Sequence, residues 1–398
     1  MPALSARLPA AFLPAARRLW AAHPWLLAGL WLLVQAAFLA RYHGPHFAND
    51  SAPYLEYAQN IAGRGYFEPG HYRRYILYPL FESLFLRLGW GWWGIVGGQL
   101  VLAALAARAL YGATRRLTPG GGRRAAALAT TLFILWPETQ QFNAYLLTES
   151  LFISLSVLAL GAFVRARNGS FGHHLLLAAL VLLCALARPN GFVVGLAAGL
   201  AGLLTLARQP TRRPFWLVLL ALAALGPVLW RLLNYQLATY TLIETYQRGD
   251  LMFLVKEWAV HAAQPLRLPP PGLSPVGRLA YFYWHNPVVG LRLVLGKLFV
   301  FASGLKPHYS LLHKAMSVLL LWPCYWLAAG AARQRRLWRP GRLFLGLVPV
   351  LQAGIVMLTV DDYDVRFLAP VLPFLFVLAA LHLTGIEQHL PTEQEPDK

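Results

Sequence analysis

The stretch Leu147–Val164 reads LTESLFISLSVLALGAFV and carries one charged side chain, Glu149, near its beginning. About 20 apolar residues in a row are enough for an α-helix to cross a lipid bilayer. Because similar apolar segments recur along the chain, the sequence favours a protein that crosses a membrane many times. The candidate spans are Trp25–Ala40, Trp92–Tyr111, Ala125–Trp136, Leu147–Val164, Leu175–Ala187, Gly191–Ala207, Phe215–Leu233, Pro287–Phe301, Lys314–Gly330, Leu343–Val360 and Phe367–Leu383.

The composition of the chain supports this interpretation. Of its 398 residues, 58% are hydrophobic and 13% are charged, whereas about a quarter of the residues of a soluble domain are charged. The composition therefore excludes an ordinary soluble enzyme, and the high apolar content excludes a disordered chain. A net charge of +19 would suggest a nucleic-acid partner in a soluble protein. The sequence has no nucleic-acid-binding motif, so we expect no such partner.

The arginines between the candidate spans predict which side of the membrane each loop faces. Loops on the cytoplasmic side of a membrane are enriched in Lys and Arg. If the arginine-rich loops face the cytoplasm, the segments Arg41–Gly91 and Asn234–Asn286 lie outside and both termini lie inside. The arginines that mark the inner segments are Arg7, Arg17, Arg18, Arg115, Arg116, Arg123, Arg124, Arg165, Arg167, Arg208, Arg212, Arg213, Arg333, Arg335, Arg336, Arg339 and Arg342.

The segment Pro287–Phe301 does not fit this alternation. If it crossed the membrane, the arginines at 333–342 would lie outside. We therefore expect it to lie in the membrane interface or to be re-entrant, and its Arg292 and Lys297 are compatible with that placement. Small residues after the first span would also suit a cleaved signal peptide. The similar segments that follow favour a retained helix.

Together these patterns predict an all-α polytopic membrane protein with about ten to eleven transmembrane helices. Residues 1–386 form a single transmembrane helical domain. Its first outer loop, 41–91, contains short juxtamembrane helices, and its second, 234–312, contains the interfacial helix. Residues 387–398 form a polar cytoplasmic tail.

The first outer loop opens on the sequence FANDSAPYLEYAQNIAGRGY, residues 47–66. Pro53–Ile61 is predicted to form a short helix, with Asp50 or Ser51 as its N-cap and the following glycines at its end. Asp is a favoured N-cap residue, so Asp50 has two interpretations. It either caps this helix or acts as a functional carboxylate at the membrane surface.

Two further candidate sites carry charged side chains at the predicted outer membrane surface. Arg73 and Arg74 lie beside aromatic residues in HYRRYILYPLF, a pattern that suits either a bound phosphate or anchoring at the interface. Glu149 lies at the outer end of its span with almost no compensating charge nearby in the sequence. A buried carboxylate needs a cationic or hydrogen-bonding partner, so we expect it to pair with Arg188 or another outer arginine.

A third acidic segment contains Asp361, Asp362 and Asp364. Carboxylate oxygens of this kind bind divalent cations, but the same residues also suit a solvated loop. The histidines His43 and His46 near Asp50 form a weak zinc signal, because their spacing matches no structural zinc motif.

These motifs, in this order, resemble the GT-C superfamily of polytopic glycosyltransferases, and in particular the bacterial relatives of protein O-mannosyltransferases and of the lipid A aminoarabinose transferase. The resemblance runs from about Trp25 to Leu383 and rests on the order of short motifs. These are the acidic residue shortly after the first span, the short Tyr- and Ala-rich helix ending in Gly-Arg-Gly-Tyr, Arg-Arg-x-x-x-Tyr-Pro-Leu-Phe, Thr148-Glu149 followed by Leu-Phe, Arg188-Pro189-Asn190-Gly191 and the run from Arg366 to Pro373.

The resemblance implies an inverting transferase of the bacterial inner membrane that works at the outer, periplasmic face. Its donor is a sugar on a polyprenyl phosphate, and its acceptor is a hydroxyl of a lipid, glycan or protein. Asp50 takes the role of the catalytic base. The donor phosphate is assigned to Arg73, Arg74, Arg188 and Arg366, and acceptor binding or orientation to Glu149, Glu56, Tyr54, Tyr78 and Asn143.

No cofactor and no metal ligand are assigned from the resemblance. Asn49 precedes Asp50 where some members of the superfamily have a second acidic residue, and this difference weakens the inference of a metal. Membrane lipids and the polyprenyl-linked donor are the expected partners.

Two other functions compete with this interpretation. A polysaccharide ligase or polymerase of a different polytopic type would use outer arginines and a histidine, and His308 beside Lys306 and Tyr309 keeps that option open. A lipid or solute transporter is disfavoured, because the sequence shows no internal two-fold repeat.

Overall fold

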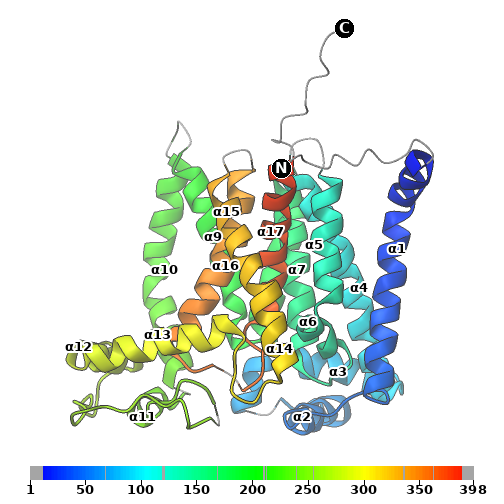
Figure 1. The fold of residues 1–398 in the computed structure, drawn as a ribbon. Coiled ribbons are helices and arrows are strands. Elements are labelled where there is room, and N and C mark those ends of the chain that lie inside the picture. Colours follow the sequence, from blue (N-terminus) through cyan, green and yellow to red (C-terminus); the bar gives the residue numbers. More distant parts are fainter. Residues whose placement is uncertain are drawn as a thin grey trace.

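The computed structural model describes residues 12–387 apart from 68, 119–121, 168, 209, 210, 212, 239, 254, 335, 336 and 362. The described residues form helices, turns and loops, and no β-strand. Each predicted span falls on a helix of the bundle in Figure 1. The helices that run along the bundle are α1 (Phe12–Arg41), α4 (Gly91–Leu117), α5 (Arg123–Leu135), α7 (Thr148–Ala166), α8 (Phe171–Ala187), α9 (Phe192–Leu206), α10 (Arg213–Ala238), α14 (Leu311–Met316) continued by η4 (Ser317–Leu321) and α15 (Trp322–Arg333), α16 (Arg339–Leu358) and α17 (Leu372–Glu387).

Seven helices of the described chain are long and apolar enough to cross a membrane. Two more, within Phe171–Ala187 and Ala369–Gly385, are apolar but shorter. The prediction of an all-α polytopic membrane protein is therefore confirmed, whereas the number of crossings stays a prediction. The predicted polar tail, 387–398, lies outside the described residues except for Glu387.

The short helices gather at one end of the bundle, which we call the outer end, opposite the N-terminus of α1 (Figure 1). They come from the two segments predicted to be outer loops. The first supplies α2 (Ser51–Arg64), η1 (His71–Tyr75) and α3 (Leu77–Arg87), and the second supplies α11 (Leu242–Arg248) and α12 (Pro275–His285).

Helix α13 (Pro287–Ser303) follows α12 after a bend of 109°. In Figure 1 both helices lie across the direction of the long helices, at the outer end of the bundle. Pro287 at the first position of α13 explains the break, because proline has no N–H for the preceding turn. The placement of α13 in the membrane interface stays a prediction.

Helix α7 is the central element of the core. Of the seven candidate spans it is the most buried, with 83% of its apolar window inside the protein, and it packs between α4 and α8. Small residues allow the close approach: a Cβ placed on Gly161 would lie 3.2 Å from the Cβ of Ala109 in α4. Small residues at such contacts are typical of helices packed in membranes.

The turn between α8 and α9 depends on a glycine. A Cβ on Gly191 would lie 1.8 Å from the carbonyl oxygen of Cys184, so the α8 backbone would have to shift. We expect Gly191→Ala to lower the free energy of unfolding by about 1–3 kcal/mol or more. Gly199→Ala is the matched control, because no atom lies within 4 Å of the added carbon there. Equal melting temperatures for the two purified variants in detergent would contradict this reading of the turn.

Candidate active site

Four charged side chains from distant parts of the chain meet at the outer end. Arg366 Nη1 lies 2.5 Å from Asp50 Oδ2, and Arg366 Nε donates to Glu149 Oε1. Arg188 Nη1 donates to the same Glu149 oxygen over 2.7 Å. We call Asp50, Arg366, Glu149 and Arg188 the ion-pair array. It joins positions that the sequence analysis selected one by one.

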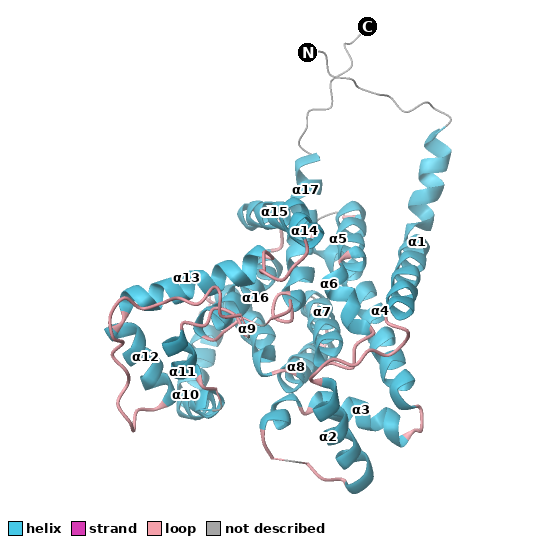
Figure 2. Cartoon of the chain, turned by 60° about the horizontal axis from the view of Figure 1, so that its bottom comes forward, coloured by secondary structure: helices cyan, strands magenta, loops and turns pink. Residues whose placement is uncertain are grey.

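The ends of two helices position Glu149 and Arg188. Glu149 stands in the first turn of α7, where the positive end of the helix dipole stabilises a carboxylate. Arg188 directly follows α8, whose negative end favours a cation. Arg366 comes from the loop between α16 and η5 (Ala369–Val371). Figure 2, turned to bring the outer end forward, shows α2 and α3 beside the ends of α7 and α8.

Asp50 is the N-cap residue of α2, but its side chain makes no capping hydrogen bond. Its carboxylate pairs with Arg366 instead. The interpretation of Asp50 as a mere helix cap is therefore wrong. The helix is also longer than predicted: it continues through Gly63 to Arg64, and Gly65, with a φ of +62° in the left-handed region, caps its C-terminal end.

Burial divides the array into an open and a closed half. The Asp50 side chain is 45% exposed, whereas Glu149 is fully buried and Arg188 nearly so. The Nε of Arg188 is buried and has no hydrogen-bond acceptor among the described residues, while its guanidinium lies 5.6 Å from the centre of the Phe367 ring. An unsatisfied buried donor is costly, so this atom is a natural contact for a ligand anion.

Tyrosines line the side of the array that faces the first outer loop. Tyr54 packs edge-on against Tyr72, Tyr75 and Tyr78, with ring centres 5.4 to 5.6 Å apart. Burial raises the pKa of Tyr54 and of Tyr75, although the charges of Arg188 and Arg366 act against the shift. Both phenols therefore stay protonated, and each can donate a hydrogen bond to a bound anion.

The paired arginines of η1 differ in their surroundings. The guanidinium of Arg74 lies 4.8 Å from the centre of the Tyr240 ring and contacts His71. Burial and the Arg74 charge lower the pKa of His71, while Asp50 raises it. Arg74, Arg188 and Arg366 all act on the charge of Tyr75, so Arg74 lies on the side of the array where this tyrosine is. Arg73 is exposed, and no contact of its side chain is described.

The remaining residues assigned to the acceptor have other surroundings. Glu56 is exposed on α2. Tyr78 is buried and donates to Gln99 Oε1 over 3.0 Å. Asn143 accepts from Ser150 Oγ over 2.7 Å and donates to Gln35 and Gln140. The hydrogen-bonding groups of the Asn143 amide are thus taken up by the protein itself, so a direct contact with an acceptor stays a prediction.

The acidic segment after α16 is also paired. Asp361 lies 2.9 Å from the ammonium of Lys306, and both are buried. The same ammonium donates to the Asp364 carbonyl over 2.6 Å, so Lys306 fixes the loop that carries Arg366. Asp362 lies outside the described residues. Within the described chain no three His, Cys, Asp or Glu side chains are grouped to hold a metal ion.

The pair between the half-buried His313 and the buried Glu138 was not singled out from the sequence. His313 Nε2 of α14 lies 2.5 Å from Glu138 Oε1, and Trp136 Nε1 donates to the other Glu138 oxygen over 2.9 Å. One signal could have found it, because Glu138 is the only acidic residue between Glu82 and Glu149.

His308 offers a test of the local electrostatics. Its ring stacks on Tyr363 at 3.7 Å, and burial together with Lys306 lowers its pKa below 6.5, against an opposing effect of Asp364. As the pH falls through about 6.5, His308 becomes protonated in the unfolded chain but stays neutral in the folded chain. Proton binding therefore favours the unfolded chain, and the protein loses stability as the pH falls. We expect His308→Gln to reduce the drop in melting temperature between about pH 7.5 and pH 5. The exposed His261, changed to Gln, should leave the drop unchanged, and an equal effect of the two changes would contradict the assignment.

The chain is similar to two crystal structures of ArnT from Cupriavidus metallidurans. The match to the apo state has 15% identity and a TM-score of 0.52, and it covers 92% of this chain and 60% of that chain. The match to the structure bound to undecaprenyl phosphate has 14% identity and a TM-score of 0.50, with 90% and 59% covered. This chain thus spans about three fifths of the length of the ArnT chains.

Neither a protein-family model nor a curated protein sequence matches the chain. The similarity is therefore carried by the arrangement of helices over nine tenths of this chain. It agrees with the resemblance that the order of short motifs indicated. The chain accordingly shares the fold of the ArnT structures.

Proposed function

We propose that this protein transfers a sugar from a polyprenyl phosphate to a hydroxyl group of an acceptor. One observation carries the proposal: the half-exposed carboxylate of Asp50 is held against Arg366, and Arg366 shares the buried Glu149 with Arg188. A carboxylate beside phosphate-binding cations is the pair of groups that this transfer needs. The GT-C fold and the undecaprenyl phosphate bound in one ArnT structure support the choice of donor.

In the proposed reaction Asp50 is the general base. It accepts the proton of the acceptor hydroxyl, whose oxygen attacks the anomeric carbon of the donor. The bond between that carbon and the phosphate oxygen breaks, and the polyprenyl phosphate leaves with the electron pair. Attack opposite to the leaving group in a single step inverts the configuration at the carbon.

The arginines bind the leaving phosphate. Arg366 and Arg188 supply N–H donors, and Arg74 adds a third positive charge beside them. Because a phosphate dianion is a stable leaving group when guanidinium groups surround it, no general acid is needed. Arg366 connects the proposed base with the proposed phosphate site, since it contacts both Asp50 and Glu149. Phosphate binding would draw Arg366 from Asp50 and free that carboxylate for its proton.

The position of the site supports work at the outer face of a bacterial inner membrane. The array lies at the end of the bundle opposite the arginine-rich loops, and these loops face the cytoplasm in membrane proteins. A polyprenyl tail stays in the bilayer, so a site at the helix ends gives the head group access to the surface. We assign no resident metal, because Asp50, Glu149 and Asp361 all have arginine or lysine partners.

Binding of the product lipid tests the phosphate half of the proposal. We expect purified protein to bind polyprenyl phosphate, and Arg366→Gln to weaken binding by about tenfold or more, the usual value of a charge-assisted hydrogen bond. Arg64→Gln is the control, because Arg64 is exposed on α2 and no contact of its side chain is described. Equal affinity of the wild type and both variants would contradict the assignment.

The ligase function remains the second candidate, and the position of His308 favours it. His308 stacks on Tyr363, three residues from Arg366, in the loop that the Lys306–Asp361 pair holds. A ligase that uses this histidine would accept a diphosphate-linked donor and would tolerate Asp50→Asn. The transferase proposed here requires Asp50 and a monophosphate-linked donor.

A further inference from the structure

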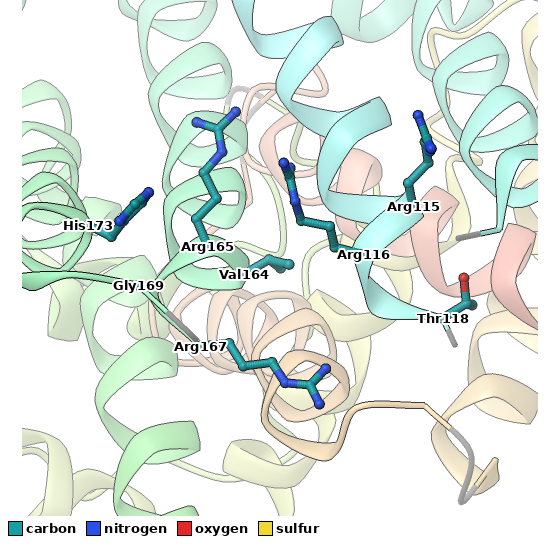
Figure 3. Close-up of a pocket in the computed structure, with 8 residues that line it drawn as sticks. All are labelled: Arg115, Arg116, Thr118, Val164, Arg165, Arg167, Gly169 and His173. Atoms are coloured by element: carbon teal, nitrogen blue, oxygen red, sulfur yellow. The ribbon is translucent and has the colours of Figure 1, made fainter. Parts of the chain in front are cut away.

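The end of the bundle opposite the ion-pair array contains a basic pocket of about 610 Å³. It lies between the last turn of α4 and the connection from α7 to α8, and Figure 3 shows its lining. Five of the lining side chains carry nitrogen donors: Arg115, Arg116, Arg165, Arg167 and His173. We call this the basic pocket.

The arginines of the basic pocket have no acidic partner among the residues that the structure describes. None of the four forms an ion pair within the described chain. The sequence itself provides none nearby, since no Asp or Glu occurs between Glu82 and Glu138 or between Glu149 and Glu244. Like charges this close together are unfavourable unless an anion binds between them.

Neighbouring groups hold some of these side chains in place. The Arg167 guanidinium lies 5.2 Å from the Trp338 ring centre, and that of Arg115 lies 6.0 Å from the Tyr111 ring centre. In Figure 3 Arg116 and Arg165 extend in the same direction, away from Arg167. Arg165 is exposed, and no hydrogen bond of its side chain is described, so its five N–H donors are available to a ligand.

The excess of positive charge in inner loops explains why arginines occur here, and helix dipoles explain why they sit at helix ends. Neither effect explains why four arginines line one pocket. Guanidinium groups bind phosphate with two parallel hydrogen bonds. Four of them around one pocket suit a ligand with more than one phosphate.

We propose that the basic pocket binds the head group of an anionic phospholipid, preferably one with two phosphates. The location favours a lipid over a soluble anion. Arg165 lies 16 residues after Glu149 in α7, or about 24 Å along the helix axis, so most of the roughly 30 Å hydrocarbon thickness of a bilayer separates the pocket from the array. Trp338 beside it is a residue type enriched at membrane interfaces. Basic pockets at the cytoplasmic ends of membrane helices are suited to such lipids.

The test compares two double variants of the full chain. Arg116→Gln with Arg165→Gln removes two charges from the basic pocket. Arg208→Gln with Arg333→Gln removes two exposed charges from other loops at the same end. Fluorescent cardiolipin, a lipid with two phosphates, is titrated into each protein in zwitterionic detergent, with phosphatidylcholine as the neutral lipid and inorganic pyrophosphate as the soluble anion. All these side chains are at the surface, so folding should be unaffected, and melting temperatures check this.

We expect cardiolipin to bind the wild type and the loop variant with equal affinity, and the pocket variant at least about tenfold more weakly. Equal loss in both variants would mean that only the overall charge matters, and it would overturn the proposal. Pyrophosphate that binds as tightly as cardiolipin, with the same dependence on the pocket, would overturn the lipid as the source of the phosphate. Because the pocket is remote from Asp50, sugar transfer can fail while this binding is present, so the two proposals are tested separately.

Discussion

Asp50→Asn is expected to reduce sugar transfer by about a hundredfold to ten-thousandfold, the usual contribution of a general base. An amide cannot accept the proton of the acceptor hydroxyl, but its oxygen can still receive the hydrogen bond from Arg366. The side chain is 45% exposed and does not cap α2, so the fold should tolerate the change. The measurement is the initial rate of transfer from polyprenyl-phosphate sugars in membranes, at matched protein levels.

Asp250→Asn is the matched control for this variant. Asp250 also lies in an outer segment and pairs with Arg248 over 2.8 Å, but that arginine side chain is 57% exposed. The Asp250 side chain itself is 17% exposed, and no role in transfer is assigned to this pair. Wild-type rates for Asp50→Asn would exclude Asp50 as the base and would favour the ligase that uses His308.

Glu149→Gln is expected to have the largest effect on stability. Glu149 is fully buried and receives hydrogen bonds from both Arg188 and Arg366. Loss of its charge leaves the buried Arg188 guanidinium without a carboxylate partner and leaves Arg366 with Asp50 alone. Removal of one partner of a buried pair typically costs about 3–5 kcal/mol, so the melting temperature in detergent should fall strongly. Transfer should fall with it, because Arg366 loses its second anchor.

A double-mutant cycle separates this pairing from a general effect of the substitution. If Glu149 and Arg188 stabilise one another, the double variant Glu149→Gln with Arg188→Met should lose less free energy of unfolding than the two single variants added together. The exposed Glu257, changed to Gln, should leave the melting temperature unchanged. Additive losses in the cycle would show that Glu149 and Arg188 do not interact.

The long helices could be predicted from the sequence because apolar length alone sets them. The array residues could also be predicted, since a membrane protein keeps buried charges only where they are paired or used. The role of the Asp50 side chain could not. A cap and a distant ion pair require the same local sequence, and the partner, Arg366, is 316 residues away. Only the fold decides between them.

Other long-range polar contacts could not be predicted from the sequence for the same reason. Gln35 is an isolated amide within an apolar segment, and the hydrogen bonds that join it to Gln140 and Asn143, which precede α7, appear only when the helices pack. Asp361 was grouped with its sequence neighbours as an oxygen ligand for a cation. Its partner is Lys306, 55 residues earlier in the sequence. Long-range pairs of this kind leave no local pattern.

The most direct measurement follows both products of the reaction at once. Purified protein in vesicles receives a panel of polyprenyl-phosphate sugars and hydroxyl acceptors, and mass spectrometry quantifies the free polyprenyl phosphate and the new glycoside. The proposal predicts that the two products appear in equal amounts with the wild type and that both are lost with Asp50→Asn. Consumption of a diphosphate-linked donor instead, at a rate that does not depend on Asp50, would contradict it.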